Sequence, residues 1–402
     1  MTAVNESLIW LLTASSGKKR NDNQLTKQKV VLVTHVYLLM IAGGFVLGVV
    51  TGWLLHRSDF CIAGMFRDLF LFRSTTMLKS LLLLIVVAML LFELIRLSGL
   101  VSFPFPKYGI PTGTNVLGGF LFGTGMVLAG GCVLGTLYRL GAGSFPSLLA
   151  FIGLITGSTL YAELHPCWST LAKALSLPTS AITLPELLSV PAWLMVMALL
   201  LFLLPLLWRW YGQGKLQKPV VVEGYLQPWQ VAIGLALVSA TFLLVIGLPM
   251  GITTSFSKLG AMLLQLVAPE YCATLVYFQK QSFQYVPSMG GGVVTGAPGP
   301  LLDGVALVQF PLISGILAGS AWSAISLGEW RMQFRLPLRQ VLSALLGGVI
   351  MGLASRMTPS CNVWHMLGGL PVMGLQSILF IAGMLPGAWI GGILLTRLVV
   401  PR

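Results

Sequence analysis

The chain has 402 residues, of which 56% are hydrophobic and 9% are charged, and its mean hydropathy is +0.89. Ordinary soluble domains carry about a quarter charged residues, so this composition excludes them and predicts an all-α polytopic membrane protein. The formal net charge of +13 is typical of an excess of Lys and Arg in cytoplasmic loops, and a field that favours anions is the alternative interpretation.

Residues 1–30 are polar and basic and are predicted to form a tail. A membrane-spanning helix needs about 20 apolar residues. Nine segments of suitable length and composition follow, at 31–56, 78–100, 112–130, 144–164, 189–210, 228–250, 302–326, 340–358 and 373–398. Four apolar segments between them are too short to span: 59–72, 132–140, 254–266 and 361–370. Such half-helices mark binding sites in transporter cores, so we expect four short re-entrant helices.

The chain contains an internal duplication. Gly118 and Gly347 are 229 residues apart, and so are Cys132 and Cys361. Further matched glycine pairs at this spacing or one residue more are Gly123 with Gly352, Gly153 with Gly383, and Gly157 with Gly387. Residues 48–61 also match 247–260 loosely. We therefore expect two four-span repeats, 31–165 and 226–402, joined by a linker at 166–225 that contains one span.

An odd number of spans between the repeats would invert the second repeat, an architecture common among secondary transporters. Basic residues follow the first, fifth, seventh and ninth spans, and they would all be cytoplasmic if the C-terminus is cytoplasmic. They are Arg57, Arg67, Arg73, Lys79, Arg209, Lys215, Lys218, Arg331, Arg335, Arg339, Arg397 and Arg402. The basic tail at 18–29 contradicts this orientation.

Three of the five cysteines, Cys61, Cys132 and Cys361, open short segments. The first turn of a helix carries unpaired N–H groups and the positive end of a dipole, so it binds anions. A thiol is a soft, weak donor, which suits a polarizable sulfur-bearing anion. Without a fixed cation beside them, such thiols would bind weakly enough to release it. The alternative is that these cysteines fill space in the core.

The residues around these cysteines also favour an anion path. Gly130 and Gly131 would let an anion approach the backbone. Ser360 is a good N-cap residue before Cys361, and Asn362 follows it. We therefore expect the substrate path to run along these positions.

Two other readings use the same thiols. His365 lies four residues after Cys361 and would share its helix face, so a soft-metal site for Cu(I) is an alternative. An intramembrane thiol enzyme is the other, although the sequence shows no activating base. We treat His365 and Arg57 as helpers at most and expect no resident metal or other cofactor. Cys167 and Cys272 lie in connections, and no basic patch with interleaved aromatics indicates nucleic acid binding.

Three blocks resemble the YeeE/YedE family of bacterial sulfur-transport proteins: HRSDFCIAGMFRD (56–68), GGFLFGTGMVLAGGCVLGTLYR (118–139) and LGGVIMGLASRMTPSCN (346–362). Their order is similar to that of the thiosulfate-uptake members. The resemblance covers about residues 40–395. One departure is that Thr-Pro-Ser, rather than a glycine pair, precedes Cys361.

The resemblance implies uptake of thiosulfate, or of a related sulfur or selenium anion, across the bacterial inner membrane. It implies an hourglass fold of nine spans with short inward helices. It also implies that Cys61, Cys132 and Cys361 pass the anion along a central path through S–H···S contacts. Some members work beside a small soluble sulfur carrier of the TusA-like type.

Overall fold

The computed structural model describes residues 22–101, 103, 108–218, 223–280, 283–287, 293–332, 334 and 336–399. Much of the predicted tail, together with Arg335 and the C-terminal Arg402, lies outside these residues. Within the predicted tail, α2 already begins at Asp22.

The long helices confirm the nine predicted spans. They are α2 (Asp22–His56), α4 (Thr76–Leu97), α5 (Thr114–Leu128), α7 (Phe145–Ala174), α9 (Ala192–Gly212), α10 (Pro228–Ile246), α14 (Gly304–Ser326), α15 (Leu338–Met357) and α16 (Leu375–Leu398). In the described part of the chain, nine stretches are long and apolar enough to cross a membrane, and one of them combines α5 with the following α6. The protein is therefore an all-α polytopic membrane protein.

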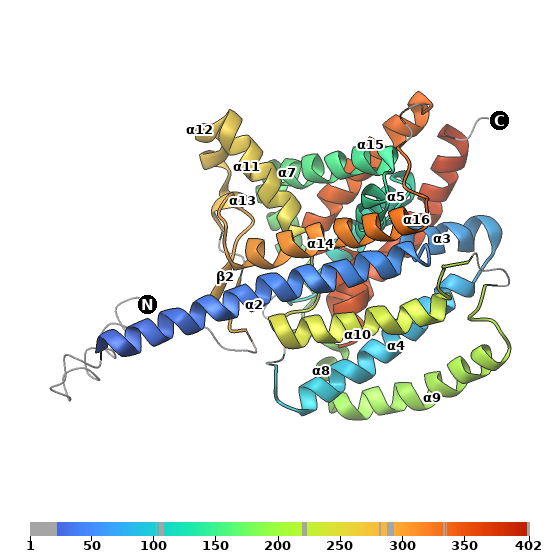
Figure 1. The fold of residues 1–402 in the computed structure, drawn as a ribbon, viewed down its shortest axis with the longest axis horizontal. Coiled ribbons are helices and arrows are strands. Elements are labelled where there is room, and N and C mark those ends of the chain that lie inside the picture. Colours follow the sequence, from blue (N-terminus) through green and yellow to red (C-terminus); the bar gives the residue numbers. More distant parts are fainter. Residues whose placement is uncertain are drawn as a thin grey trace.

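Short helices form in all four segments that are too brief to span. They are α3 (Ile62–Phe72), α6 (Val133–Gly141), α11 (Thr254–Val267) and the π-helix η1 (Trp364–Gly369). The remaining elements are α8 (Leu184–Leu187), α12 (Pro269–Thr274), α13 (Val276–Gln279) and the antiparallel pair β1 (Phe283–Tyr285) and β2 (Val294–Gly296). In Figure 1, α3 and α11 lie near opposite ends of the bundle.

The helices pack in pairs that join the two halves of the chain. α5 packs on α16 and α15 packs on α7, while α2 packs on α14 and α10 packs on α4. In the predicted duplication, α5 corresponds to α15 and α7 to α16, so the α5–α16 and α15–α7 contacts are equivalent. Likewise α2 corresponds to α10 and α4 to α14, so the α2–α14 and α10–α4 contacts are equivalent. This pattern supports the predicted duplication, and the inverted orientation in a membrane stays a prediction.

The duplicated glycines lie where these helix backbones touch. A Cβ at Gly123 would clash with the carbonyl oxygen of Met384 on α16, and one at Gly352 would clash with that of Leu154 on α7. Similar backbone contacts occur at Gly153, Gly157, Gly383 and Gly387. The 229-residue spacing therefore reflects two copies of one close helix contact.

The loose match of residues 48–61 with 247–260 is wrong. Cys61 is the N-cap of α3, and Thr253 is the N-cap of α11. Thr253 is therefore the counterpart of Cys61. Gly48 lies inside α2, packed on α14, whereas Gly247 already ends α10 with a φ of +83°. The glycines misled the alignment because they serve different purposes in the two halves.

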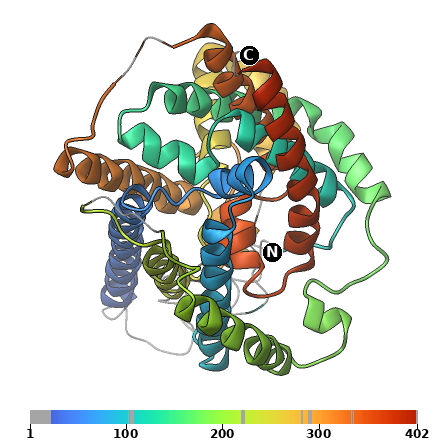
Figure 2. The same cartoon turned by 90° about the vertical axis from the view of Figure 1, so that its right-hand side faces the viewer.

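The end of α2, the start of α4 and the end of α9 lie at one end of the bundle, which faces the viewer in Figure 2. Arg57 donates to the Ser326 hydroxyl at the end of α14 and to the carbonyl of Gly224. Lys79 at the start of α4 lies over the Trp210 ring at the end of α9. Arg57 and Lys79 therefore lie at the same end of the bundle, which is consistent with the predicted orientation.

Candidate functional site

Two buried thiols meet at the starts of two short helices. Cys61 is the N-cap of α3 and Cys132 is the N-cap of α6, and both have extended backbone conformations. Their sulfurs lie close together beside Gly135, and the residues are only 2% and 1% exposed. The Cys132 sulfur also accepts a hydrogen bond from the Gly135 N–H at 3.3 Å. The structure thus brings together two predicted site residues that are far apart in sequence.

Gly135 makes room for this thiol pair. A Cβ there would lie 2.7 Å from the Cys61 sulfur and 3.5 Å from the Cys132 sulfur. Our sequence reasoning missed this residue. The available signal was a glycine inside a short helix, where it costs about 1 kcal/mol relative to Ala and so calls for a packing or functional reason.

Cys361 connects to the pair through its neighbour. It is fully buried and directly precedes the helical turn that begins at Asn362, much as Cys132 directly precedes α6. The Asn362 side chain lies close enough to the Cys132 thiol to interact with it. By hydrogen-bond geometry, neither atom of the Asn362 amide has a partner in the described part of the chain. Buried polar atoms without partners are costly, so they mark a place where a polar ligand would be stabilised.

The residues before the cysteines have identifiable roles in the local structure. Gly130 has a φ of +76°, which only glycine adopts easily, and it is exposed, with its carbonyl accepting from Arg139 at 2.5 Å. Gly131 packs tightly on the start of α6. Backbone conformation and packing therefore explain this glycine pair. Ser360 does not act as an N-cap, because its hydroxyl has no hydrogen-bond partner among the residues described.

The two proposed helpers have structural partners. The buried His365 ring bonds the Ser377 hydroxyl at 2.9 Å and stacks on Phe380 with 4.2 Å between centroids. Arg57 bonds Ser323 and Ser326 on α14. These contacts assign both side chains packing roles. Within the described ranges, no group of three or more His, Cys, Asp or Glu side chains could hold a metal ion.

A polar cavity of about 450 Å³ lies beside the thiol pair. We call it the vestibule; it is lined by His56, Ser58, Asp59, Tyr138, Arg139, Ala142, Ser144, Lys218, Tyr225 and Leu226. Asp59, two residues before Cys61, has a φ of +50°. Its carboxylate accepts from Tyr138 at 2.5 Å and from Arg139 at 3.1 Å. The vestibule thus carries cationic groups next to the thiols, with one carboxylate held among them.

Opposing effects act on the acidic group of the vestibule. Burial acts to raise the pKa of the Asp59 carboxyl, but the nearby Arg139 charge and the Tyr138 hydroxyl outweigh it and hold the pKa below its ordinary value. Asp59 therefore stays ionised near neutral pH and keeps Arg139 paired.

A buried cation was missed entirely. Arg356 lies in the last turn of α15 and is 8% exposed. Its guanidinium donates to the hydroxyls of Thr253 and Thr254 at the start of α11. The sequence reasoning did not anticipate this buried cation at the start of α11. The signal was an Arg inside an apolar span, which is by default a functional-site hypothesis.

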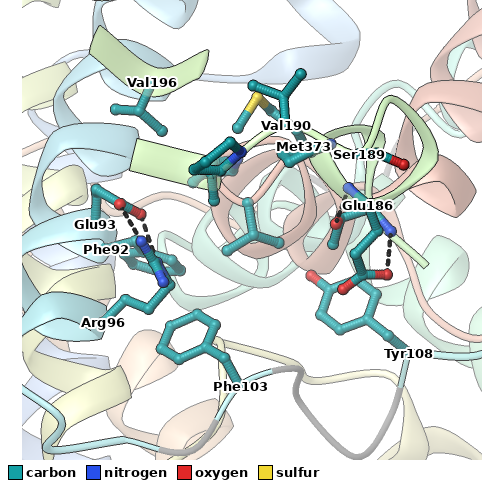
Figure 3. A pocket seen from close by; sticks show the side chains of 16 residues that line it. Phe92, Glu93, Arg96, Phe103, Tyr108, Glu186, Ser189, Val190, Val196 and Met373 are labelled. Atoms are coloured by element: carbon teal, nitrogen blue, oxygen red, sulfur yellow. Dashed lines mark hydrogen bonds and ion pairs between the residues drawn. The ribbon is translucent and has the colours of Figure 1, made fainter. Parts of the chain in front are cut away.

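A second cavity, of about 460 Å³, lies between α4, α8 and the loop after η1. Figure 3 shows the Glu93–Arg96 ion pair on one side of it, and Tyr108 and Glu186 on the other. The Arg96 guanidinium donates to Glu93 at 2.8 and 2.5 Å, so the two opposite charges on α4 pair with each other. None of the three central cysteines lines this cavity.

The family model described as sulphur transport matches residues 57–390, a range that contains all three cysteines and most of the vestibule. The chain belongs to this family. It is 29% identical to the thiosulfate transporter TsuA of Spirochaeta thermophila over 87% of this chain and 99% of that protein. It is 28% identical to the thiosulfate transporter TsuA of Escherichia coli, over 87% of this chain and 93% of that protein.

A shorter match joins the chain to the probable transporter YedE of Escherichia coli, at 33% identity over 39% of this chain and 37% of that protein. The sulphur transport family and these relatives make the chain a membrane transporter rather than an enzyme.

Proposed function

We propose that the chain takes up thiosulfate across the bacterial inner membrane, and that the anion passes along Cys61, Cys132 and Cys361. The observation that carries this proposal is the contact between the buried Cys61 and Cys132 thiols, with Asn362 linking them to Cys361. The relatives that match nearly their whole length are thiosulfate transporters.

The chemistry of the thiol pair suits transient binding. Thiosulfate carries a soft terminal sulfur and three hard oxygens. A thiol offers the sulfur a polarizable partner, while the Asn362 amide offers N–H donors to an oxygen. Each contact is weak, and conduction needs binding that is favourable but readily reversed. We therefore expect no covalent step on these cysteines.

The proposed topology has two inverted repeats, at 31–165 and 226–402, with the linker 166–225 between them. We place the end with the basic side chains, including the vestibule, in the cytoplasm, together with the C-terminus. The pairing of counterpart helices and the clustering of Arg57 and Lys79 support this arrangement. A soluble sulfur carrier of the TusA-like type would then meet the vestibule end.

Uptake into proteoliposomes tests the proposal. The purified chain should accumulate labelled thiosulfate above empty liposomes, and unlabelled thiosulfate should compete better than sulfate. Stronger competition by selenite or sulfite would transfer the assignment to that anion. Accumulation of Cu(I) without thiosulfate would refute the assignment.

A further inference from the structure

Buried basic side chains in this protein divide into two kinds. Lys258 on α11 is fully buried, and its ammonium group pairs with the Asp303 carboxylate at 2.8 Å. Arg356 is nearly as buried, but in the described part of the chain no carboxylate lies within ion-pair distance of it. A charge inside a membrane protein is costly unless an opposite charge or strong hydrogen bonds compensate it.

The partners of Arg356 are all neutral. The guanidinium bonds the Thr253 hydroxyl, and it lies 3.5 Å from the Thr254 hydroxyl and 3.4 Å from that of Ser355. Because a guanidinium has five N–H donors, these three contacts leave donors unused. Hydroxyls therefore hold the positive charge in place, and no carboxylate among the described residues neutralises it.

The surroundings increase the local positive potential. Thr253 is the N-cap of α11, a helix of 14 residues, so the positive end of its dipole lies beside the guanidinium. Arg356 also lies five residues before Cys361 on the same segment. An anion held there would contact the same chain segment that carries the third cysteine of the proposed path.

We propose that Arg356, Thr253 and the first turn of α11 form a binding site for a small divalent oxyanion, the substrate itself. This inference rests on the proposed function, and it adds a charged site to a path that otherwise uses thiols. The anion supplies the missing counter-charge, and its oxygens take the unused guanidinium donors in a fork geometry that suits Arg. The hydroxyls that already share the guanidinium limit the gain, so the anion can move on.

A permanent counter-charge tests the site. Thr253→Asp places a carboxylate next to Arg356. Thr253→Asn is the matched control, because its side chain has nearly the size of Asp but no charge. We expect full-length Thr253→Asp protein to bind labelled thiosulfate at least about tenfold more weakly than Thr253→Asn, because the carboxylate occupies the cation. Equal binding by the two variants would overturn the inference.

Thermal unfolding separates binding from folding. If Arg356 were only structural, the new ion pair in Thr253→Asp would leave thiosulfate-induced stabilisation unchanged. We expect instead that thiosulfate raises the melting temperature of the wild type and of Thr253→Asn, but raises that of Thr253→Asp much less.

Arg356→Lys keeps the charge but loses the forked pair of N–H donors, so it should bind thiosulfate more weakly than wild type and more tightly than Arg356→Gln. Equal thiosulfate binding by Arg356→Lys and Arg356→Gln would count against the site.

The controls keep this inference apart from the proposed function. The double variant Glu93→Gln/Arg96→Gln removes a charge pair elsewhere and should bind as wild type. If wild type transports thiosulfate, Cys132→Ala does not, and Thr253→Asp matches Thr253→Asn, then the Arg356 site is wrong and the thiol path stands. If wild type shows no thiosulfate uptake, the proposed function itself fails.

Discussion

The two halves of the molecule share their helix contacts but present different groups where their first short helices begin. In the first half, α3 begins at Cys61, whose thiol contacts Cys132. In the second half, α11 begins at Thr253, whose hydroxyl contacts the buried Arg356. The N-cap of α3 offers a soft thiol, whereas the N-cap of α11 offers a hydroxyl that holds a buried guanidinium.

The difference between Cys61 and Thr253 shows that the two halves share their helix packing but not the side chains at the starts of their short helices. Glycines such as Gly123 and Gly352 bring one helix backbone against another, so any side chain there would collide with main chain. The positions at the starts of α3 and α11 carry different side chains, Cys61 and Thr253. Under the proposed function, a duplicated frame would place chemically distinct groups at equivalent points, which would suit an anion with a soft sulfur and hard oxygens.

The largest effect should come from removing the thiol of the first half. We expect Cys132→Ala to reduce thiosulfate uptake by about tenfold or more, and Cys132→Ser to be nearly as impaired, because an oxygen is a poor partner for a soft sulfur. The exposed Cys167 offers the control Cys167→Ala. Wild-type uptake by Cys132→Ser, at equal protein in the membrane, would rule out a soft-donor role.

The shared frame can be tested by matched glycine variants. Gly123→Ala and Gly352→Ala each introduce a Cβ against a backbone carbonyl, so each should lower the free energy of unfolding by about 1–3 kcal/mol. The two losses should be similar, as measured by thermal unfolding in detergent. Gly212→Ala is the control, since a Cβ there has nothing within 4 Å. A loss confined to one of the two halves would show that their packing is not equivalent.

Crowding the thiols without removing them should have a moderate effect. Gly135→Ala would push the Cys61 sulfur aside, and we expect uptake to fall by about three- to tenfold with little change in stability, because Ala favours the helix. Transport kinetics and thermal unfolding measured on the same preparation separate the two quantities. Unchanged uptake would mean that the spacing of the two sulfurs is unimportant.

The smallest effect concerns the carboxylate in the vestibule. Asp59→Asn removes the counter-charge of Arg139, and we expect uptake to fall by about two- to threefold because the anion is retained longer beside an unmasked cation. The pKa of Asp59 is lower than its ordinary value. The ion pair between Asp59 and Arg139 is therefore intact at any pH above the ordinary pKa, and it is lost only when the pH falls through the lowered pKa. The ratio of wild-type to variant uptake should therefore stay constant from about pH 8 to about pH 5. A ratio that changes in this range would show that another group controls the pair.

The sequence predicted the spans and the places of the cysteines well, because apolar length and helix starts are local properties. It predicted less well what depends on backbone conformation and on distant partners. Gly130 adopts a positive φ and its carbonyl binds Arg139, which residue spacing does not reveal. The correspondence of Thr253 with Cys61 was hidden because the connections before α3 and α11 differ in length.

The pairing of helices also limits how the transporter can move. Close backbone contacts join α2 to α14, α5 to α16 and α7 to α15, and each of these pairs takes one helix from each half. Rocking one half against the other would separate all of these interlocked contacts at once, with no side chains between them to adapt. We therefore expect turnover to be governed by fast, local rearrangements of the short helices and their side chains, with a small activation volume and without a large-scale change of shape.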